Sequence, residues 1–318
     1  MRIPPETALF STLAVVAAVA YLAADPGVPL VVQTAVIAVL VAVLGVPHGA
    51  LDPVVARRVG LWRTPRGLIT FTLGYLAISA AVIGVWFVAP LLSLTVFLLI
   101  SAAHFGGDWN ADRPWPLRFL AGAALLSLPA LADHAAVAEL YVVLAGEGAA
   151  EIAAAQSFIA PALLVGMIAA AVMAARRRPH EGIELALAAL LALTTPPLVF
   201  FIIYFCLLHS ARHLREGFRD ERDTLPKRTT VTIVAAATAA PLLVAVGVLA
   251  ATAQPGALDD RLLQVVFIGL AALTVPHMMV VALGDRALAR AVAAHPTAGE
   301  RDPPAISRRN DETAPITS

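Results

Sequence analysis

Apolar runs of roughly membrane-spanning length recur along most of this 318-residue chain. A helix needs ~20 mainly apolar residues, with a range of about 17–25, to cross the hydrocarbon core of a bilayer. The run from Ile183 to Leu214 is too long for one helix. Thr195-Pro196-Pro197 divides it, because proline cannot continue a helix without losing a hydrogen bond. The runs predict ten spans: 8–24, 28–48, 67–89, 91–107, 117–133, 152–175, 183–195, 198–214, 229–252 and 262–284.

The composition places the chain in the membrane class. It is 59% hydrophobic and only 14% charged, with a mean hydropathy of +0.82, whereas soluble domains are nearer half apolar and a quarter charged. We therefore predict an all-α, polytopic integral protein of the cell membrane with about ten transmembrane segments. The net charge of zero gives no indication of a nucleic-acid partner. The single cysteine, Cys206, excludes an internal disulfide and is expected to be buried.

The distribution of basic residues supports this number of spans. Cytoplasmic loops of membrane proteins are enriched in Lys and Arg. If the N-terminus is cytoplasmic, ten spans leave every one of the 22 basic residues except Arg261 in cytoplasmic segments. A miscounted span would distribute these residues over both faces. Both termini are therefore predicted to be cytoplasmic.

The C-terminal segment differs in composition from the membrane region. Residues 1–290 are predicted to form one polytopic catalytic domain. Residues 291–318, rich in Pro, Asp, Arg and Thr, are predicted to form a disordered cytoplasmic tail. Residues 1–24 have two readings, a first span or a cleaved signal peptide, since a basic residue precedes a short apolar run. We favour the span, because the run is long for a signal peptide and a second span follows almost at once.

Five histidines lie within or at the ends of apolar runs. Under the predicted topology, four of them lie at the cytoplasmic ends of three spans, and His277 lies about two turns inside the cytoplasmic end of the last span. Ionisable groups at membrane depth are costly and usually functional. Imidazole is a good ligand for iron, copper and zinc. The pattern predicts a metal site between helices, with four candidate ligands: His48, His104, His209 and His213.

The spacing within this set favours one shared ion. His209 and His213 are four residues apart, so they lie on the same helix face and can hold one metal ion, with His48 and His104 added from two other helices. A lone histidine near a helix end is more often an interfacial hydrogen-bonding residue than a ligand. Agreement in depth across three spans favours the metal site.

Two carboxylates and an aromatic cluster accompany these histidines. Four neutral imidazoles would leave the ion its full charge in a low dielectric. Asp52 and Asp108 each follow a histidine by four residues, so each could accept an N–H from a ligand imidazole, although either could instead simply cap or solvate a helix end. An aromatic cluster precedes His209 and would suit a long apolar substrate, although such clusters are more often core or lipid-facing: Phe200, Phe201, Tyr204 and Phe205.

The order and the residues of four motifs resemble those of the Brp/Blh family of bacterial and archaeal β-carotene 15,15′-dioxygenases. The similar region runs from about residue 45 to 284. The motifs are Gly-Val-Pro-His-Gly-Ala-Leu-Asp, Ser-Ala-Ala-His-Phe-Gly-Gly-Asp-Trp, Tyr-Phe-Cys-Leu-Leu-His-Ser-Ala-Arg-His and Val-Pro-His-Met.

The resemblance implies an Fe(2+) enzyme that splits the central double bond of β-carotene with O2 to give two retinals. It implies that His48, His104, His209 and His213 are the catalytic iron ligands, with His277 near the site but outside the ligand set. The implied partners are β-carotene, O2 and membrane lipid, with a rhodopsin as a possible acceptor of retinal.

Other functions remain open from the residues alone. Paired histidines on different helices could hold haem in a membrane redox protein, although the pair spaced four apart converges better on one ion. Membrane desaturases resemble di-metal sites with more histidine boxes than this chain has. A transporter or assembly factor without catalysis could use the histidines for proton or metal movement.

Overall fold

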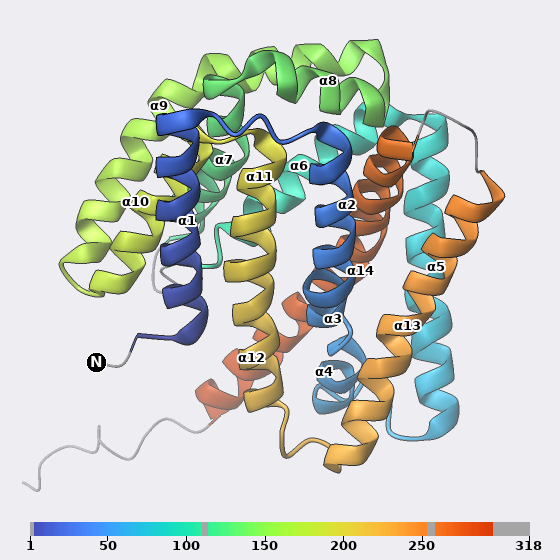
Figure 1. The fold of residues 1–318 in the computed structure, drawn as a ribbon. Coiled ribbons are helices and arrows are strands. Elements are labelled where there is room, and N and C mark those ends of the chain that lie inside the picture. Colours follow the sequence, from blue (N-terminus) through green and yellow to red (C-terminus); the bar gives the residue numbers. More distant parts are fainter. Residues whose placement is uncertain (1–2, 110–113, 253–257, 295–318) are drawn as a thin grey trace, which may run out of the picture.

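The computed structural model describes residues 3–109, 114–252 and 258–294, and every regular element within these ranges is a helix (Figure 1). Proline is the first residue of several helices, where its missing N–H breaks no hydrogen bond and its fixed φ suits the first turn. The elements are α1 (Pro5–Ala24), α2 (Leu30–Leu40), η1 (Val41–Gly45), α3 (Val46–Gly49), α4 (Asp52–Arg58), α5 (Pro65–Val88), α6 (Pro90–Phe105), α7 (Trp115–Ala132), α8 (His134–Ala145), η2 (Glu147–Ala149), α9 (Ala150–Ala175), α10 (Pro179–Thr194), α11 (Pro197–Phe201), η3 (Ile202–Ser210), α12 (Ala211–Asp220), α13 (Lys227–Ala251) and α14 (Leu258–Ala294).

Each of the ten predicted spans overlaps a helix, and the polytopic membrane class is confirmed. Among the described residues, eight helical runs are long and apolar enough to cross a membrane. The other two predicted spans correspond to α6 and α10, which have 16 residues each. At 1.5 Å per residue, such a helix is about 24 Å long.

The helix α8 lies in a segment that the sequence assigned to a connection. It has 12 residues, begins after Asp133, whose side chain accepts the Ala136 N–H, and ends before Gly146 with φ of 83°. Figure 1 shows α8 lying across one end of the bundle rather than along it. Its length and placement explain why a search for spans does not find it.

The connections rich in arginine gather at the end opposite α8. The α4–α5 connection and the α12–α13 connection both lie at that end (Figure 1). Arg261 lies near the start of α14, close to α8, where Gln264 donates to the Val143 carbonyl oxygen at 2.9 Å. This arrangement matches the predicted separation of basic residues between the two faces.

The exterior of the bundle is apolar, and small residues allow some of its helices to pack closely. Phe87, Val88 and Phe158 are 79, 87 and 86% exposed, as expected for side chains that face lipid. Between helices, a Cβ atom on Gly182 would lie 2.7 Å from the Ala171 carbonyl oxygen, so α9 and α10 meet backbone to backbone. Membrane helices associate closely through such small residues.

Two interrupted helical rods carry most of the candidate ligands. One is formed by α2, η1 and α3, and the other by α11, η3 and α12; η1 and η3 are π-helical. Ion pairs tie the second rod to its neighbours through Arg215 and Glu6 at 2.7 Å, and Glu221 just beyond the rod pairs with Arg58 at 2.7 Å. Because Glu6 belongs to α1, the predicted first span is integrated into the bundle.

The predicted domain boundary at residue 290 falls inside α14, which is described as far as Ala294. Most of the predicted tail, 295–318, lies outside the described residues.

Candidate metal centre

His48 lies on α3, directly after the π-helical turn η1. Pro47 has no N–H to donate, and the helix widens ahead of it, with the Val46 N–H bonded to the Val41 carbonyl oxygen five residues back. The Gly45 carbonyl oxygen contacts Nδ1 of His48. A carbonyl oxygen only accepts, so Nδ1 carries the hydrogen and Nε2 keeps a lone pair for a metal.

His104 lies one residue before the end of α6, where α6 touches α7. A Cβ atom on Gly106 would lie 2.0 Å from the Arg118 carbonyl oxygen, and one on Gly122 would lie 1.9 Å from the Ala102 carbonyl oxygen. Neither distance is sterically possible, so only glycine permits this approach. The contact fixes the end of α6 and with it the position of His104.

His209 lies near the end of η3, and His213 follows on α12. Their ring centroids are 4.5 Å apart, as the spacing predicts. Their Nε2 atoms face different partners, since Nε2 of His209 lies 3.1 Å from Nε2 of His104, whereas Nε2 of His213 lies 3.1 Å from Oδ1 of Asp108. The side chain of His209 is fully buried, and that of His213 is 37% exposed.

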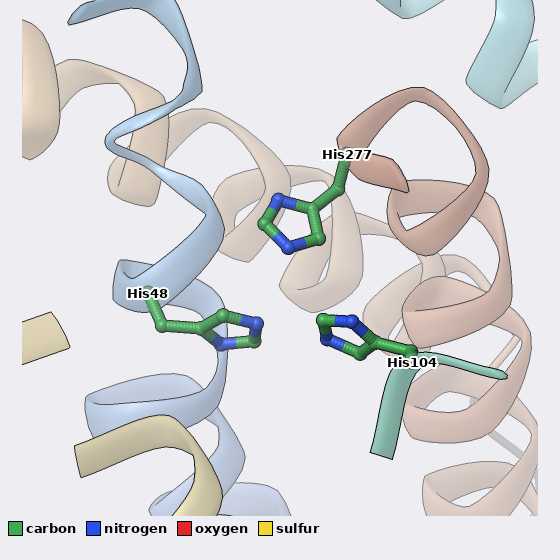
Figure 2. Close-up of side chains that lie close together, drawn as sticks. All are labelled: His48, His104 and His277. Atoms are coloured by element: carbon green, nitrogen blue, oxygen red, sulfur yellow. The ribbon is translucent and has the colours of Figure 1, made fainter. Parts of the chain in front are cut away.

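All five histidines gather in one place, including His277 from α14. Figure 2 shows the rings of His48, His104 and His277 pointing toward a common space from three elements, and their ligand atoms lie within 4.8 Å of one another. A second such group combines His209 and His213 with a carboxylate. Nitrogens that share one ion at about 2.0–2.1 Å are expected about 3–4 Å apart, and the contact between His104 and His209 fits this distance.

The two predicted aspartates bind imidazoles, but not those of their own motifs. Oδ1 of Asp52 accepts from Nδ1 of His277 at 2.8 Å, and Oδ1 of Asp108 accepts from Nδ1 of His209 at 2.9 Å. The helix ends between each histidine and its aspartate, so the four-residue spacing does not place the two on one face. Each carboxylate instead reaches a ring on another helix.

The carboxylate of Asp108 is a buried anion with several donors. Burial disfavours its charged form, and the rings of His209 and His213 offset this cost through contacts with Oδ1 at 2.9 and 3.1 Å. The Tyr204 hydroxyl donates to Oδ2 at 2.6 Å, and Arg212 donates to the backbone oxygen of Asp108 at 3.1 Å. Negative charge is therefore held beside the imidazole cluster.

The four aromatic residues predicted to bind substrate divide into two stacked pairs. Phe201 and Phe205 stack with centroids 4.8 Å apart, and Phe205 also stacks on His209 at 5.6 Å. Phe200 and Tyr204 stack at 5.9 Å, on the side where Tyr204 reaches the aspartate. Phe205 presents its face to the imidazoles, whereas the ring of Tyr204 is tilted against His209 at 6.3 Å and its hydroxyl contacts Asp108.

Two polar groups were missed from the sequence. The Tyr75 hydroxyl donates to Oδ2 of Asp52 at 3.0 Å. Glu184 is fully buried and accepts from Thr7 at 2.5 Å, from Trp109 at 2.8 Å and from Arg212 at 2.6 Å. Both side chains lie in predicted spans, where the cost of a polar group at membrane depth was the available signal.

A cavity of about 560 Å³ lies between α2, α8, α11 and α14, toward the end of the bundle that carries α8. Leu198 and Leu263 are among the residues that line it. Leu198 precedes His209 in the α11–η3–α12 rod by 11 residues, and Leu263 precedes His277 in α14 by 14 residues, or about 16 and 21 Å of axial rise. The cavity is therefore distinct from the imidazole cluster and is separated from it along the bundle axis.

The residues present fit a divalent transition metal. Neutral imidazole suits iron, copper and zinc, and five rings converge here. A cation buried among neutral rings requires compensation. The side chains of Asp52 and Asp108 are 4 and 0% exposed, and each binds a ring of the cluster, so together they match two positive charges.

Comparisons with known proteins find similar sequences. A family model described as beta-carotene 15,15′-dioxygenase matches residues 39–285, a range that contains all the site residues named above except Thr7. A relative from an uncultured marine bacterium, 66A03, named beta-carotene 15,15′-dioxygenase, is 29% identical over 255 residues, covering 76% of this chain and 90% of the relative. No solved structure matches.

Proposed function

The chain belongs to the β-carotene 15,15′-dioxygenase family, and on that premise we propose that it splits the central double bond of β-carotene with O2 to give two molecules of retinal. The reaction breaks one C=C bond and puts one oxygen atom of O2 into each aldehyde, so O2 is the oxidant and no proton is gained or lost. The observation that carries the proposal is the buried imidazole cluster inside an apolar helical bundle.

The proposed cofactor is Fe(2+). His48, His104, His209 and His213 are the predicted ligands, and the metal, when bound, supplies the activation of O2. Nδ1 of His48 and Nδ1 of His209 each donate to an oxygen, which turns Nε2 toward the cluster. Such contacts fix the tautomer of a ligand ring and raise its basicity. Since the overall reaction moves no proton, a site whose carboxylates are occupied by imidazoles suits it.

The proposed substrate site lies along η3 and α14. Phe201 contacts Phe267 at 5.1 Å between ring centroids, and Phe205 lies against the rings of His48 and His209. These aromatic faces would hold the polyene beside the metal. Along the α11–η3–α12 rod and along α14 they lie between the cavity and the histidines, so we propose that the cavity receives one end of the carotenoid.

The apolar exterior suits a substrate that is dissolved in lipid. A carotenoid can enter laterally from the bilayer, and retinal can return to lipid or pass to a retinal-binding protein such as a rhodopsin. Both steps fit a protein of the cell membrane with exposed apolar helices.

The test combines metal analysis with product analysis of the purified protein. We expect about one iron per chain, no Soret band, and retinal as the apolar product when β-carotene is supplied. The His209→Ala variant should lose both iron and activity, because it removes a buried ligand. The matched control is His134→Ala at the exposed start of α8, which should retain both. A Soret band would favour a haem protein, and iron without cleavage of any carotenoid would refute the dioxygenase assignment.

A further inference from the structure

We propose that His277 is itself a ligand of the metal and that Asp52 and Tyr75 hold it in place. This inference rests on the metal site proposed above. The three residues come from α14, α4 and α5, and none of the three elements carries another candidate ligand. The inference adds a fifth imidazole, with its own carboxylate, to the predicted set.

The hydrogen bonds of His277 determine which nitrogen is free. Oδ1 of Asp52 lies 2.8 Å from Nδ1 of His277. A carboxylate of this kind accepts only, so Nδ1 carries the hydrogen and Nε2 has the lone pair. Figure 2 shows the ring of His277 directed between His48 and His104, and its centroid is 5.3 Å from the centroid of each. The free nitrogen therefore faces the same space as the nitrogens of two predicted ligands.

His277 fits this role better than His213 in two respects. Nε2 of His213 is already 3.1 Å from Oδ1 of Asp108, whereas Nε2 of His277 is not in contact with a carboxylate among the described residues. The side chain of His277 is 12% exposed, against 37% for His213. The pattern at His277 repeats that at His209, where Nδ1 donates to an aspartate and Nε2 faces the cluster.

The charge of Asp52 supports a cation at this position. Its side chain is 4% exposed, and its contacts are the Tyr75 hydroxyl at 3.0 Å and the ring of His277. A buried carboxylate is expensive unless it is paired with positive charge. A metal on Nε2 of His277 would provide that charge through the ring. Tyr75 also lies 3.2 Å from the Leu273 carbonyl oxygen, which anchors its hydroxyl to α14 itself.

The first test measures metal binding without turnover. Titration of the metal-free protein with Co(II) should give a visible ligand-field spectrum, and His277→Ala should change its intensity and weaken the binding. Adding imidazole to His277→Ala should restore the spectrum, because it can occupy the space that the side chain leaves. If His277→Ala had the same Co(II) spectrum and dissociation constant as the natural protein, the inference would be overturned. The proposed function would still stand in that case, provided that the natural protein binds iron and forms retinal.

Two conservative variants cover the case in which His277→Ala does not fold. Asp52→Asn and Tyr75→Phe keep the side-chain volumes, and loss of a hydrogen-bond partner of a ligand typically weakens metal binding by about 10–100-fold. We expect a loss in this range for Asp52→Asn and a smaller one for Tyr75→Phe. The matched control is Tyr21→Phe, since the Tyr21 hydroxyl has no hydrogen-bond partner among the described residues. Wild-type Co(II) affinity in both Asp52→Asn and Tyr75→Phe would overturn the inference.

Discussion

Nε2 of His104 and Nε2 of His209 lie 3.1 Å apart, although 105 residues separate them in the chain. Two lone pairs repel at this distance, so a hydrogen or a cation must lie between the nitrogens. Because Nδ1 of His209 donates to Asp108, Nε2 of a neutral His209 ring has no hydrogen to offer. Either His104 donates from its own Nε2 or both rings bind one cation, and the second arrangement is the one that a metal centre requires.

Asp108→Asn should weaken the metal centre without abolishing it. The substitution keeps the shape of the side chain but removes a buried negative charge beside His209 and His213. We expect metal affinity to fall by about 10–100-fold, with a parallel loss of retinal formation at limiting iron. Titration with iron followed by product chromatography measures both. Asp223→Asn, whose side chain is 88% exposed, is the control and should behave as wild type.

Phe201→Ala should affect the reaction while leaving metal binding intact. The change opens space between Phe205 and Phe267, against which Phe201 packs. Misplacement of a substrate by about 1 Å can lower a rate by about 100-fold, so we expect slower cleavage, with some longer apocarotenals beside retinal. Chromatography of the products and iron analysis distinguish the two effects. Phe158→Ala removes a ring that is 86% exposed and should leave both unchanged; iron loss in Phe201→Ala would instead indicate that Phe201 supports the ligands.

Loss of the Glu184–Arg212 ion pair should destabilise the fold. Glu184 is fully buried, and Arg212 is 12% exposed. Removing one partner of a buried pair leaves an uncompensated charge and typically costs about 3–5 kcal/mol. Reversible unfolding in mixed detergent should show this loss for Glu184→Gln, with a smaller loss in the double variant Glu184→Leu/Arg212→Met. Arg222→Ala breaks the exposed Arg222–Asp223 pair and should cost only about 0–1 kcal/mol.

The topology predicts which face of the membrane each connection reaches. Cys206 is fully buried and should not react with a membrane-impermeant maleimide, so single cysteines can be added to the natural sequence. Ala24→Cys, at the exposed end of α1, should be labelled from outside intact cells. Arg63→Cys, in the α4–α5 connection, should be labelled only after permeabilisation. Equal labelling of both in intact cells would show that the number of spans is wrong.

The sequence predicted the helical class well, because the length of an apolar run and the position of basic residues are both read directly from it. It did not predict α8, since a 12-residue helix that lies across the bundle has neither the length nor the flanking charge of a span. Nor does an apolar run show its own helix type. The π-helical segments η1 and η3 depend on backbone hydrogen bonding, which the length of an apolar run does not show.

At the site, the sequence predicted which residues gather but not how they pair. Spacing within one helix places His213 near His209, because both lie on one continuous rod. Spacing could not show that Asp52 contacts His277, 225 residues away, since that contact depends on how α4 and α14 pack. Tyr204 illustrates the same limit: its place in an aromatic run predicted a substrate wall, but the run could not show that its hydroxyl also donates to Asp108.

The helix α6 has 16 residues and spans about 24 Å, less than the ~30 Å hydrocarbon thickness of a typical bilayer. Non-helical backbone is tolerated at membrane depth only where protein covers it or water lines it. The turn that follows α6 meets this condition, because Phe105 and Trp109 are 5 and 2% exposed. A helix this short is expected to end within the hydrocarbon core, which would place His104 below the lipid headgroups. Bilayer thickness then becomes a determinant of how readily water, as opposed to dissolved oxygen and carotenoid, reaches the centre.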